Sequence, residues 1–228
     1  MSALAGKSIL ITGGGSGIGR GPASFFVEAG ARVTICGRRA ERIEAVAEAI
    51  GEQCHGVAAD ITNGADRERL VAEAMAHGGG LDALINNAGN MYRGPVETLD
   101  EDRRIDLFHS NVVAAMMLTG LCTEALAARR GAVLFIGSVH TRRAFPAVSP
   151  YAASKGAVEA VSKVLAAELG GRQIRVNCIL PGAVYTEINQ RAGLFDDETA
   201  RQRLESIAPL HALGRIGKER DIAEAMAY

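Results

Sequence analysis

The chain has 228 residues, of which 48% are hydrophobic and 22% are charged, and its formal net charge is −1. The length fits one α/β domain with a substantial core, and the composition is ordinary for a globular protein. So small a net charge offers no long-range attraction to nucleic acid or to an anionic membrane, so we expect neither as a partner.

The N-terminal segment and the cysteines bear on the compartment. No charged stretch precedes an apolar run of signal-peptide length, and no run approaches the ~18 apolar residues of a membrane span. The cysteines form neither a CxxC pair nor a cluster with metal-ligand spacing, so we predict no metal site and a reducing compartment, the cytoplasm. They are Cys36, Cys54, Cys122 and Cys178.

Short apolar runs alternate with longer amphipathic stretches along the chain. The runs predict strands at residues 8–12, 33–36, 56–59, 83–86, 132–136 and 175–180. The amphipathic stretches predict helices at residues 18–29, 40–50, 66–77, 102–128, 151–169 and 218–227. This alternation is typical of βαβ units. We therefore predict an α/β fold: a single domain, residues 1–228, with a doubly wound parallel sheet (a Rossmann fold) and helices on both faces.

One long segment, 186–214, contains no predicted strand. Ligands of open α/β folds bind beyond the carboxyl ends of the strands, and this segment follows the last predicted one. We therefore expect it to form a substrate lid. The alternative is a surface helical excursion with no role in binding.

A glycine-rich turn follows the first predicted strand and opens the first predicted helix. Its pattern is TGxxxGxG, with Thr12, Gly13, Gly17 and Gly19, and no register meets the strict GxGxxG spacing. Glycines permit positive φ and close backbone approach, and a helix N-terminus offers free N–H groups to a pyrophosphate. The position of the turn favours a phosphate-binding role over a mere tight turn.

Further motifs follow the turn in chain order. They are Asn86-Asn87-Ala88-Gly89 after the fourth strand, Asn111 in a long helix, Ser138, the Tyr151/Lys155 pair and Pro181-Gly182 after the sixth strand. Together these features resemble the short-chain dehydrogenase/reductase family over nearly the whole chain. The resemblance implies an NAD(P)-dependent oxidoreductase that transfers a hydride between nicotinamide and a small alcohol or carbonyl substrate.

The end of the second strand bears on the choice of cofactor. An acidic residue there binds the ribose hydroxyls of NAD, but this chain has Gly37 followed by Arg38 and Arg39. A guanidinium binds a 2′-phosphate that a carboxylate would repel, so we favour NADP(H) over NAD(H), with Arg38 as the main contact. One of these arginines is alternatively a solvated charge. Ser16 is not basic, so a second NADP signal found in many relatives is absent.

The resemblance implies a set of cofactor-binding residues. Asp60 would meet the adenine amino group, although a helix N-cap is a competing role that Asn63 would fill equally well. The backbone near Val184 and the hydroxyl of Thr186 would meet the carboxamide. The full set is Thr12, Gly13, Ser16, Gly17, Ile18, Gly19, Arg38, Arg39, Asp60, Ile61, Asn87, Ala88, Gly89, Tyr151, Lys155, Pro181, Gly182, Val184 and Thr186.

Tyr151 and Lys155 are the central catalytic candidates. Their spacing places them on one face of a helix, where a nearby ammonium lowers the pKa of a phenol. Tyr151 would then act as general acid and base, with Lys155 tuning it and holding the nicotinamide ribose. Ser138 would donate a hydrogen bond to the substrate oxygen. By resemblance, Asn111 would hold a water that links Lys155 to solvent.

The substrate is not named by the sequence. Ser138 and Tyr151 would contact its reacting oxygen, and His140 would bond a polar group or be an exposed loop residue. Other pocket candidates are Met91, Tyr92, Phe145 and Tyr185. Three basic residues would dock an acidic carrier protein or be solvated helix ends: Arg129, Arg130 and Arg172.

The sequence departs from the family pattern in two places, the first predicted helix and the C-terminal end. Pro22 falls early in the first predicted helix, which would start late or kink. The sequence given stops at Tyr228, so the seventh strand and C-terminal tail of relatives are apparently missing. The resemblance implies a homo-oligomer, a tetramer or dimer, that associates through the helices at 102–128 and 151–169.

Other functions are compatible with a glycine-rich turn. A non-catalytic NAD(P)-binding sensor on the same fold is the main alternative, although it need not keep a proton relay. A Rossmann-like methyltransferase is disfavoured by Arg38 and the Tyr151/Lys155 pair. An epimerase or dehydratase of the wider superfamily is disfavoured by the glycine spacing and the short lid region.

Overall fold

The computed structural model of the protein describes residues 4–188, 193 and 196–227. Within them, six parallel strands form one sheet in the order β3-β2-β1-β4-β5-β6. The strands are β1 (Ser8–Thr12), β2 (Arg32–Gly37), β3 (Cys54–Ala58), β4 (Ala83–Asn86), β5 (Ala132–Ile136) and β6 (Arg175–Ile179). The strand order reverses between β1 and β4, and such a switch point forms the ligand crevice of doubly wound folds. The predicted Rossmann-type sheet is confirmed.

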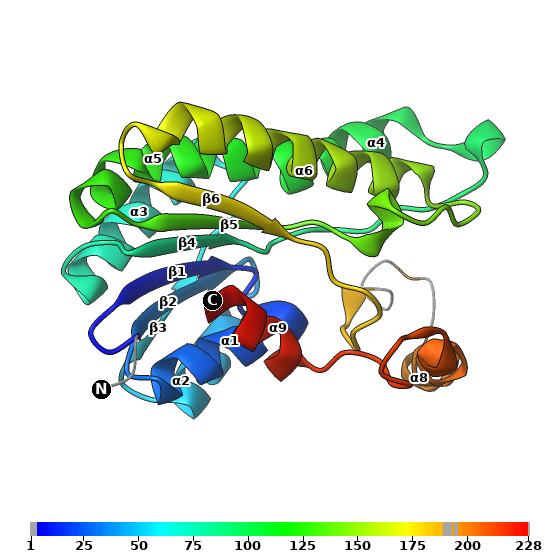
Figure 1. Ribbon diagram of the computed structural model, residues 1–228, viewed down its shortest axis with the longest axis horizontal. Coiled ribbons are helices and arrows are strands. Elements are labelled where there is room, and N and C mark those ends of the chain that lie inside the picture. Colours follow the sequence, from blue (N-terminus) through cyan, green and yellow to red (C-terminus); the bar gives the residue numbers. More distant parts are fainter. Residues whose placement is uncertain (1–3, 189–192, 194–195, 228) are drawn as a thin grey trace.

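Helices cover both faces of the sheet (Figure 1). One face carries α1 (Gly17–Glu28), α2 (Ala40–Ile50) and α9 (Glu219–Ala227). The other carries α3 (Gly64–Gly78), α4 (Glu101–Phe108), α5 (Ala114–Arg129) and α6 (Ser149–Gly170). A further helix, α8 (Asp197–Ile207), projects beyond the carboxyl ends of the strands.

The two hydrophobic cores follow from the alternation of side chains along each strand. In β1, Leu10 belongs to the core that α3, α5 and α6 cover. Its neighbours Ile9 and Ile11 belong to the core that α1, α2 and α9 cover. Most positions of the central strands β1, β4 and β5 are apolar and buried, which explains why these strands were recognisable as apolar runs.

The predicted helix at 102–128 is interrupted. The structure divides it into α4, a π-helical turn η2 (His109–Val113) and α5. Apolar periodicity does not reveal a π-turn, because the wider turn only shifts the register of the pattern. The turn contains Asn111, so the difference bears directly on the candidate site.

The expected effect of Pro22 on α1 is not observed. Helix α1 begins at Gly17 and continues through Pro22 to Glu28. Proline has no N–H to donate to the carbonyl of Ile18, yet Pro22 is buried and packed within the helix. Helix α9 packs closely against this part of α1. A Cβ on Gly21 would lie 2.3 Å from the Cβ of Glu219, so only glycine leaves room for this contact.

One described stretch, Glu101–Arg129, is long and apolar enough to cross a membrane by length and composition, which differs from the expectation above. Its inner side is buried in the core through Ala114, Leu118 and Cys122. It is therefore a core helix of the α/β fold. Its outer side exposes large apolar residues, among them Met116, Met117 and Leu121.

Strand β6 forms one edge of the sheet. Within the described ranges no strand pairs with its outer edge. An unpaired strand edge is a surface on which another strand can form hydrogen bonds.

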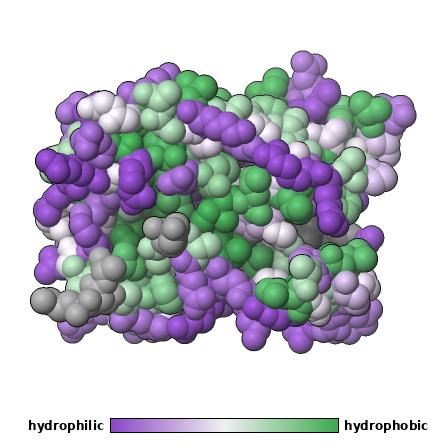
Figure 2. Space-filling model, viewed as in Figure 1, coloured by the Kyte–Doolittle hydropathy of each residue, from purple (hydrophilic) through white to green (hydrophobic). Residues whose placement is uncertain are grey.

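On the face seen in Figure 2, hydrophobic residues gather across the middle between hydrophilic rims.

Candidate active site

A cavity of about 910 Å³ opens at the carboxyl ends of the strands. Most of the predicted cofactor, catalytic and substrate residues line it. They are Gly13, Ser16, Gly17, Ile18, Arg38, Asp60, Ile61, Asn87, Ala88, Gly89, Met91, Ser138, His140, Phe145, Tyr151, Lys155, Pro181, Gly182, Val184 and Thr186. Among the described residues, the predicted ones outside its lining are Thr12, Gly19, Arg39, Tyr92, Asn111 and Tyr185.

The glycine turn is held against the loop after β4. Gly13 has a φ of 69°, and a Cβ there would lie 2.9 Å from the Cα of Ala88. The buried Thr12 hydroxyl accepts hydrogen bonds from the N–H groups of Asn87 (3.1 Å) and Ala88 (2.9 Å). The Asn87 amide donates to the Thr12 carbonyl at 2.8 Å. Thr12 therefore positions the turn from behind the cavity wall.

The adenosine end of the cavity distinguishes the two predicted arginines. Arg38 is exposed, lines the cavity and has no side-chain partner among the described residues. Arg39 lies outside the lining and forms an ion pair with Glu187 at 3.5 Å. Arg42 also pairs with Glu187, at 2.7 Å, and its Nε donates to the Gly15 carbonyl of the glycine turn at 3.0 Å. Sequence reasoning missed Arg42, whose helical position resembles that of any surface arginine.

Asp60 does not cap a helix. Asn63 is the N-cap of α3, because its side chain accepts from the N–H of Asp66. Asp60 uses Oδ1 to accept from the N–H (2.9 Å) and the hydroxyl (2.7 Å) of Thr62. Within the described ranges its Oδ2 has no hydrogen-bond partner, and Asp60 lines the cavity. The carboxylate is therefore oriented with a free acceptor at the cavity wall.

Tyr151 and Lys155 lie on one face of α6, and both are buried. Burial raises the pKa of Tyr151 to about 12, and a hydrogen bond with Ser138 opposes that rise. Burial also lowers the pKa of Lys155 to about 8. The Lys155 ammonium donates to the Ile136 carbonyl at 2.6 Å and lies 5.8 Å from the Tyr151 ring centroid. Burial therefore raises the Tyr151 pKa in this structure, opposite to the direction expected from the neighbouring Lys155 ammonium.

The π-turn orients Asn111 toward the same region. Its Nδ2 donates to the Asn90 carbonyl (3.0 Å) and to the Ser154 hydroxyl (3.1 Å), while its Oδ1 accepts from the Asn90 N–H (2.8 Å). A Cβ on Gly89 would lie 3.3 Å from Asn111 Oδ1 and 3.6 Å from Lys155 Nζ. Gly89 therefore lies between these two polar groups, and its lack of a side chain leaves the space between them open.

His140 sits beside the reacting groups. Its Nδ1 lies 2.9 Å from the Ser138 hydroxyl oxygen, and its ring meets the Tyr151 ring edge-to-face at a centroid distance of 5.5 Å. Burial lowers the pKa of His140, and the positive charge of Arg93 lowers it further. The ring is therefore neutral at pH 7, and it is half-buried at the cavity wall rather than a free loop side chain.

A family model described as "short chain dehydrogenase" matches residues 7–196. The chain belongs to the short-chain dehydrogenase family. Glucose 1-dehydrogenase of Gluconobacter oxydans is 35% identical over 237 residues, spanning 99% of this chain and 85% of that protein. L-fucose dehydrogenase of Bos taurus is 36% identical over 230 residues, spanning 98% and 83%.

Solved structures agree with this family assignment. A short-chain dehydrogenase/reductase of unknown function from Caenorhabditis elegans, crystallised with cofactor, matches with a TM-score of 0.91 and 28% identity, covering 97% of this chain and 87% of that one. The 3-ketoacyl-(acyl-carrier-protein) reductase of Brucella melitensis, complexed with NADH, matches with a TM-score of 0.87 and 32% identity, covering 99% and 90%.

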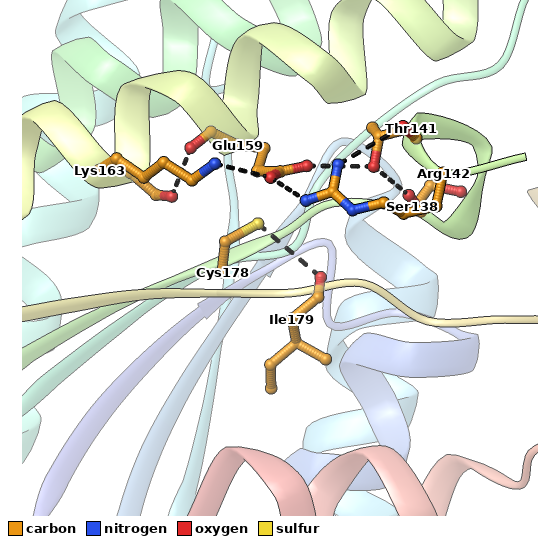
Figure 3. A network of polar contacts seen from close by, with 8 residues as sticks. Ser138, Thr141, Arg142, Glu159, Lys163, Cys178 and Ile179 are labelled. Carbon is orange, nitrogen blue, oxygen red and sulfur yellow. Dashed lines mark hydrogen bonds and ion pairs between the residues drawn. The ribbon is translucent and has the colours of Figure 1, made fainter.

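In this short-chain dehydrogenase, a polar network behind Ser138 ties the loop after β5 to α6 (Figure 3). The buried Glu159 carboxylate accepts from Arg142 and, at 2.9 Å, from Lys163, which approach it from opposite sides. The Thr141 hydroxyl donates to Glu159 (3.1 Å) or to the Ser138 carbonyl (3.0 Å). Hydrogen bonds from Arg142 and Lys163 lower the pKa of Glu159 to about 2.

Glu159→Gln is expected to lower the melting temperature by a few degrees at pH 7 and to reduce kcat more than it raises KM. The variant loses the charge that holds Arg142, so the turn carrying Ser138 loosens. The folded protein binds the Glu159 proton more weakly than the unfolded chain does. The stabilisation is therefore fully present above about pH 4.5 and is lost as the pH falls toward 2.

Thermal melts between pH 3 and pH 7, read beside steady-state kinetics, test this prediction. The matched control is Glu168→Gln, which removes an exposed carboxylate from the same helix. Equal melting curves for the two variants at pH 7 would show that the Glu159 network does not stabilise the loop.

Three predicted roles differ from the structure. Tyr92 turns away from the cavity, because its hydroxyl accepts from the Asp100 N–H at 2.8 Å. Tyr185 lies outside the lining, with Arg201 placed 5.9 Å above its ring. The basic residues considered either for carrier docking or as solvated helix ends precede β5 and β6, at the end of the sheet opposite the cavity. There Arg129 donates to the Gly79 carbonyl, and Arg172 pairs with Glu124.

His211 is a cavity residue that sequence reasoning missed. Its Nε2 accepts from the Ala183 N–H at 3.2 Å, and its Nδ1 donates to the Ile207 carbonyl at 3.1 Å. It therefore joins the segment that follows α8 to the Pro181–Val184 loop. A lone histidine in a region without strand signals gave no indication of this role.

Proposed function

We propose that this family member is an NADP(H)-preferring dehydrogenase/reductase that converts alcohols and carbonyl compounds with Tyr151 as general acid and base. One observation carries the proposal: Ser138, Tyr151 and Lys155 line the same cavity as the glycine turn. A sensor on the same fold would need the turn but not the three reacting groups. Turnover of a ketone panel with NADPH tests the proposal, and absence of turnover alongside tight NADPH binding would favour the sensor.

The described residues fit a dinucleotide. Gly13 leaves open space where a side chain would collide with Ala88, and the first turn of α1 lies at the cavity wall. Asp60 presents an unpartnered acceptor, which suits an adenine amino group. Arg38, unpaired and beside Gly37, supports recognition of a 2′-phosphate. Val184 and Thr186 also line the cavity, and we infer that they hold the nicotinamide.

The nicotinamide cofactor supplies the hydride acceptor or donor when it is bound. This chain supplies the proton and the binding of the oxygen. Tyr151, protonated because burial raises its pKa to about 12, donates its proton to the carbonyl oxygen during reduction. Lys155 and Asn111, next to each other across Gly89, support return of the proton from solvent. In the oxidative direction the phenolate form of Tyr151, which a nearby ammonium and an oxidised nicotinamide would favour, would accept the alcohol proton.

Ser138 can bind the substrate oxygen only if its single hydrogen is free. The neutral His140 ring meets this need when its proton is on Nδ1, because Nδ1–H then donates to the Ser138 oxygen. The His140 backbone N–H also donates to that oxygen, at 3.3 Å. Ser138 would then accept both bonds and direct its own hydrogen toward the charge that develops on the substrate oxygen.

The proposal also covers the role of the 186–214 segment, the oligomeric state and the cellular compartment. Residues of the 186–214 segment, including Leu204, Ile207 and His211, line the cavity, which supports a lid role. The exposed apolar residues Met116, Met117 and Leu121 on α5 support self-association to a dimer or tetramer, which sedimentation would measure. The described cysteines are all free thiols, which suits the cytoplasm.

A further inference from the structure

The substrate end of the cavity carries positive charge without a matching carboxylate. Arg93 and Arg143 line the same cavity as the reacting groups, and the charge of Arg93 acts on His140, whose ring contacts Tyr151. Asp60 is the only acidic side chain among the described lining residues, and it belongs to the adenosine end beside Gly37 and Arg38. Cations that share a low-dielectric wall with no acid repel one another and attract an anion.

Some arginines near the site are paired with carboxylates of the protein. Arg142 binds Glu159, and Arg42 binds Glu187. By contrast, the side chains of Arg93 and Arg143 have no hydrogen bond or ion pair within the part of the chain that the structure describes. Arg93 is half-buried and Arg143 is exposed, so the cost of leaving a guanidinium without a partner falls mainly on Arg93, and a bound anion would offset it.

One backbone hydrogen bond and the effect of its charge place Arg93 relative to the catalytic loop. The N–H of Gly94 donates to the Ala147 carbonyl at 2.9 Å, so the two loops that hold Arg93 and His140 are joined. The charge of Arg93 is close enough to lower the pKa of His140, whose ring contacts Tyr151. An anion bound by Arg93 would therefore lie on the substrate side of Tyr151.

Large apolar side chains also line the cavity. Met91, Phe145, Leu204 and Leu210 line it together with Arg93. We infer that the substrate is a carbonyl or alcohol compound with an apolar body and an anionic oxygen group, which Arg93 binds and Arg143 assists. This inference rests on the proposed function for the reaction and adds the substrate class. Sugars, the substrates named for two relatives, carry no such charge.

Matched probe pairs test the inference. One pair is 4-oxopentanoate and its methyl ester, and the other is dihydroxyacetone phosphate and dihydroxyacetone. We expect kcat/KM with NADPH to be at least about tenfold higher for the anion of at least one pair. Arg93→Gln should remove that preference, mainly by raising KM, and leave the neutral probe within about twofold.

Two controls separate the role of Arg93 from other effects. Arg175→Gln removes an exposed, unpartnered arginine at the start of β6, the opposite end of the sheet, and should change neither probe. The NADPH dissociation constant of Arg93→Gln should stay unchanged, and a loss of NADPH affinity would overturn the inference by making Arg93 a cofactor contact. The His140 pKa, followed by NMR, should rise in Arg93→Gln.

Binding measurements distinguish failure of this inference from failure of the proposed function. If no probe is turned over, calorimetric titration of the NADP⁺-saturated protein with the two anions decides. Binding that Arg93→Gln abolishes supports the inference and refutes the proposed activity. No binding of either anion, or equal turnover of charged and neutral probes, overturns the inference.

Discussion

Tyr151→Phe is expected to lower kcat/KM for carbonyl reduction by roughly 10²–10⁴-fold, the range for removal of a general acid. The phenol is buried beside Ser138, and burial keeps it protonated at neutral pH. The variant loses only the hydroxyl, so NADPH binding should be retained. Initial rates of NADPH consumption, with NADPH affinity measured on the same samples, check this prediction.

The matched control for this change is Tyr185→Phe. Tyr185 is in the loop after β6, outside the cavity lining, and its ring is partly exposed. Its loss of a hydroxyl should leave kcat/KM within about twofold. Activity of Tyr151→Phe within threefold of the parent would mean that another group supplies the proton, and the acid/base assignment would be wrong.

Arg38→Gln weakens NADPH binding about tenfold or more and leaves NADH binding unchanged, so the two affinities converge. Arg38 is an unpaired cation at the cavity wall, and the neighbouring Gly37 offers no carboxylate to ribose hydroxyls. Because Arg38 is exposed, the preference of the parent protein for NADPH should shrink at high salt. Dissociation constants for both cofactors, at low and high salt, provide the measurement.

Arg39→Gln is the control, because Arg39 carries the same charge one residue along the chain but pairs with Glu187 outside the lining. It should leave both affinities within about twofold. Equal binding of NADPH and NADH by the parent protein would contradict the assignment of Arg38. So would a larger loss from Arg39→Gln than from Arg38→Gln.

The fold was readable because its signals are local. Buried parallel strands appear as apolar runs, and the predicted strand 83–86 coincides with β4. Less regular signals moved the boundaries: β3 begins at Cys54, where it pairs with Val33 of β2, rather than at residue 56. The glycine turn and the Tyr151/Lys155 spacing were readable for the same reason, since each is a contiguous pattern on one element.

The rest of the site depends on contacts between distant segments. Nothing in the sequence pairs Arg39 and Arg42 with Glu187, although among the described residues this pairing leaves Arg38 without a carboxylate partner. The direction of Tyr92 is fixed by Asp100, in a loop whose course periodicity does not predict. The pKa of Tyr151 depends on burial, which spacing does not measure. Long-range polar contacts therefore required the structure.

The π-turn at His109–Val113 has a consequence for changes in chain length. A helix advances by about 100° per residue, so deletion of one residue from this turn would rotate α5 relative to α4 by that amount unless the turn tightened to α-helical spacing. If it tightened, Leu107 and Leu118 would keep their core positions, but the amide of Asn111 would lose its place beside Asn90 and Ser154. A single deletion would thus preserve the fold and remove part of the candidate active site. In a sequence alignment the same deletion would appear only as a one-residue gap.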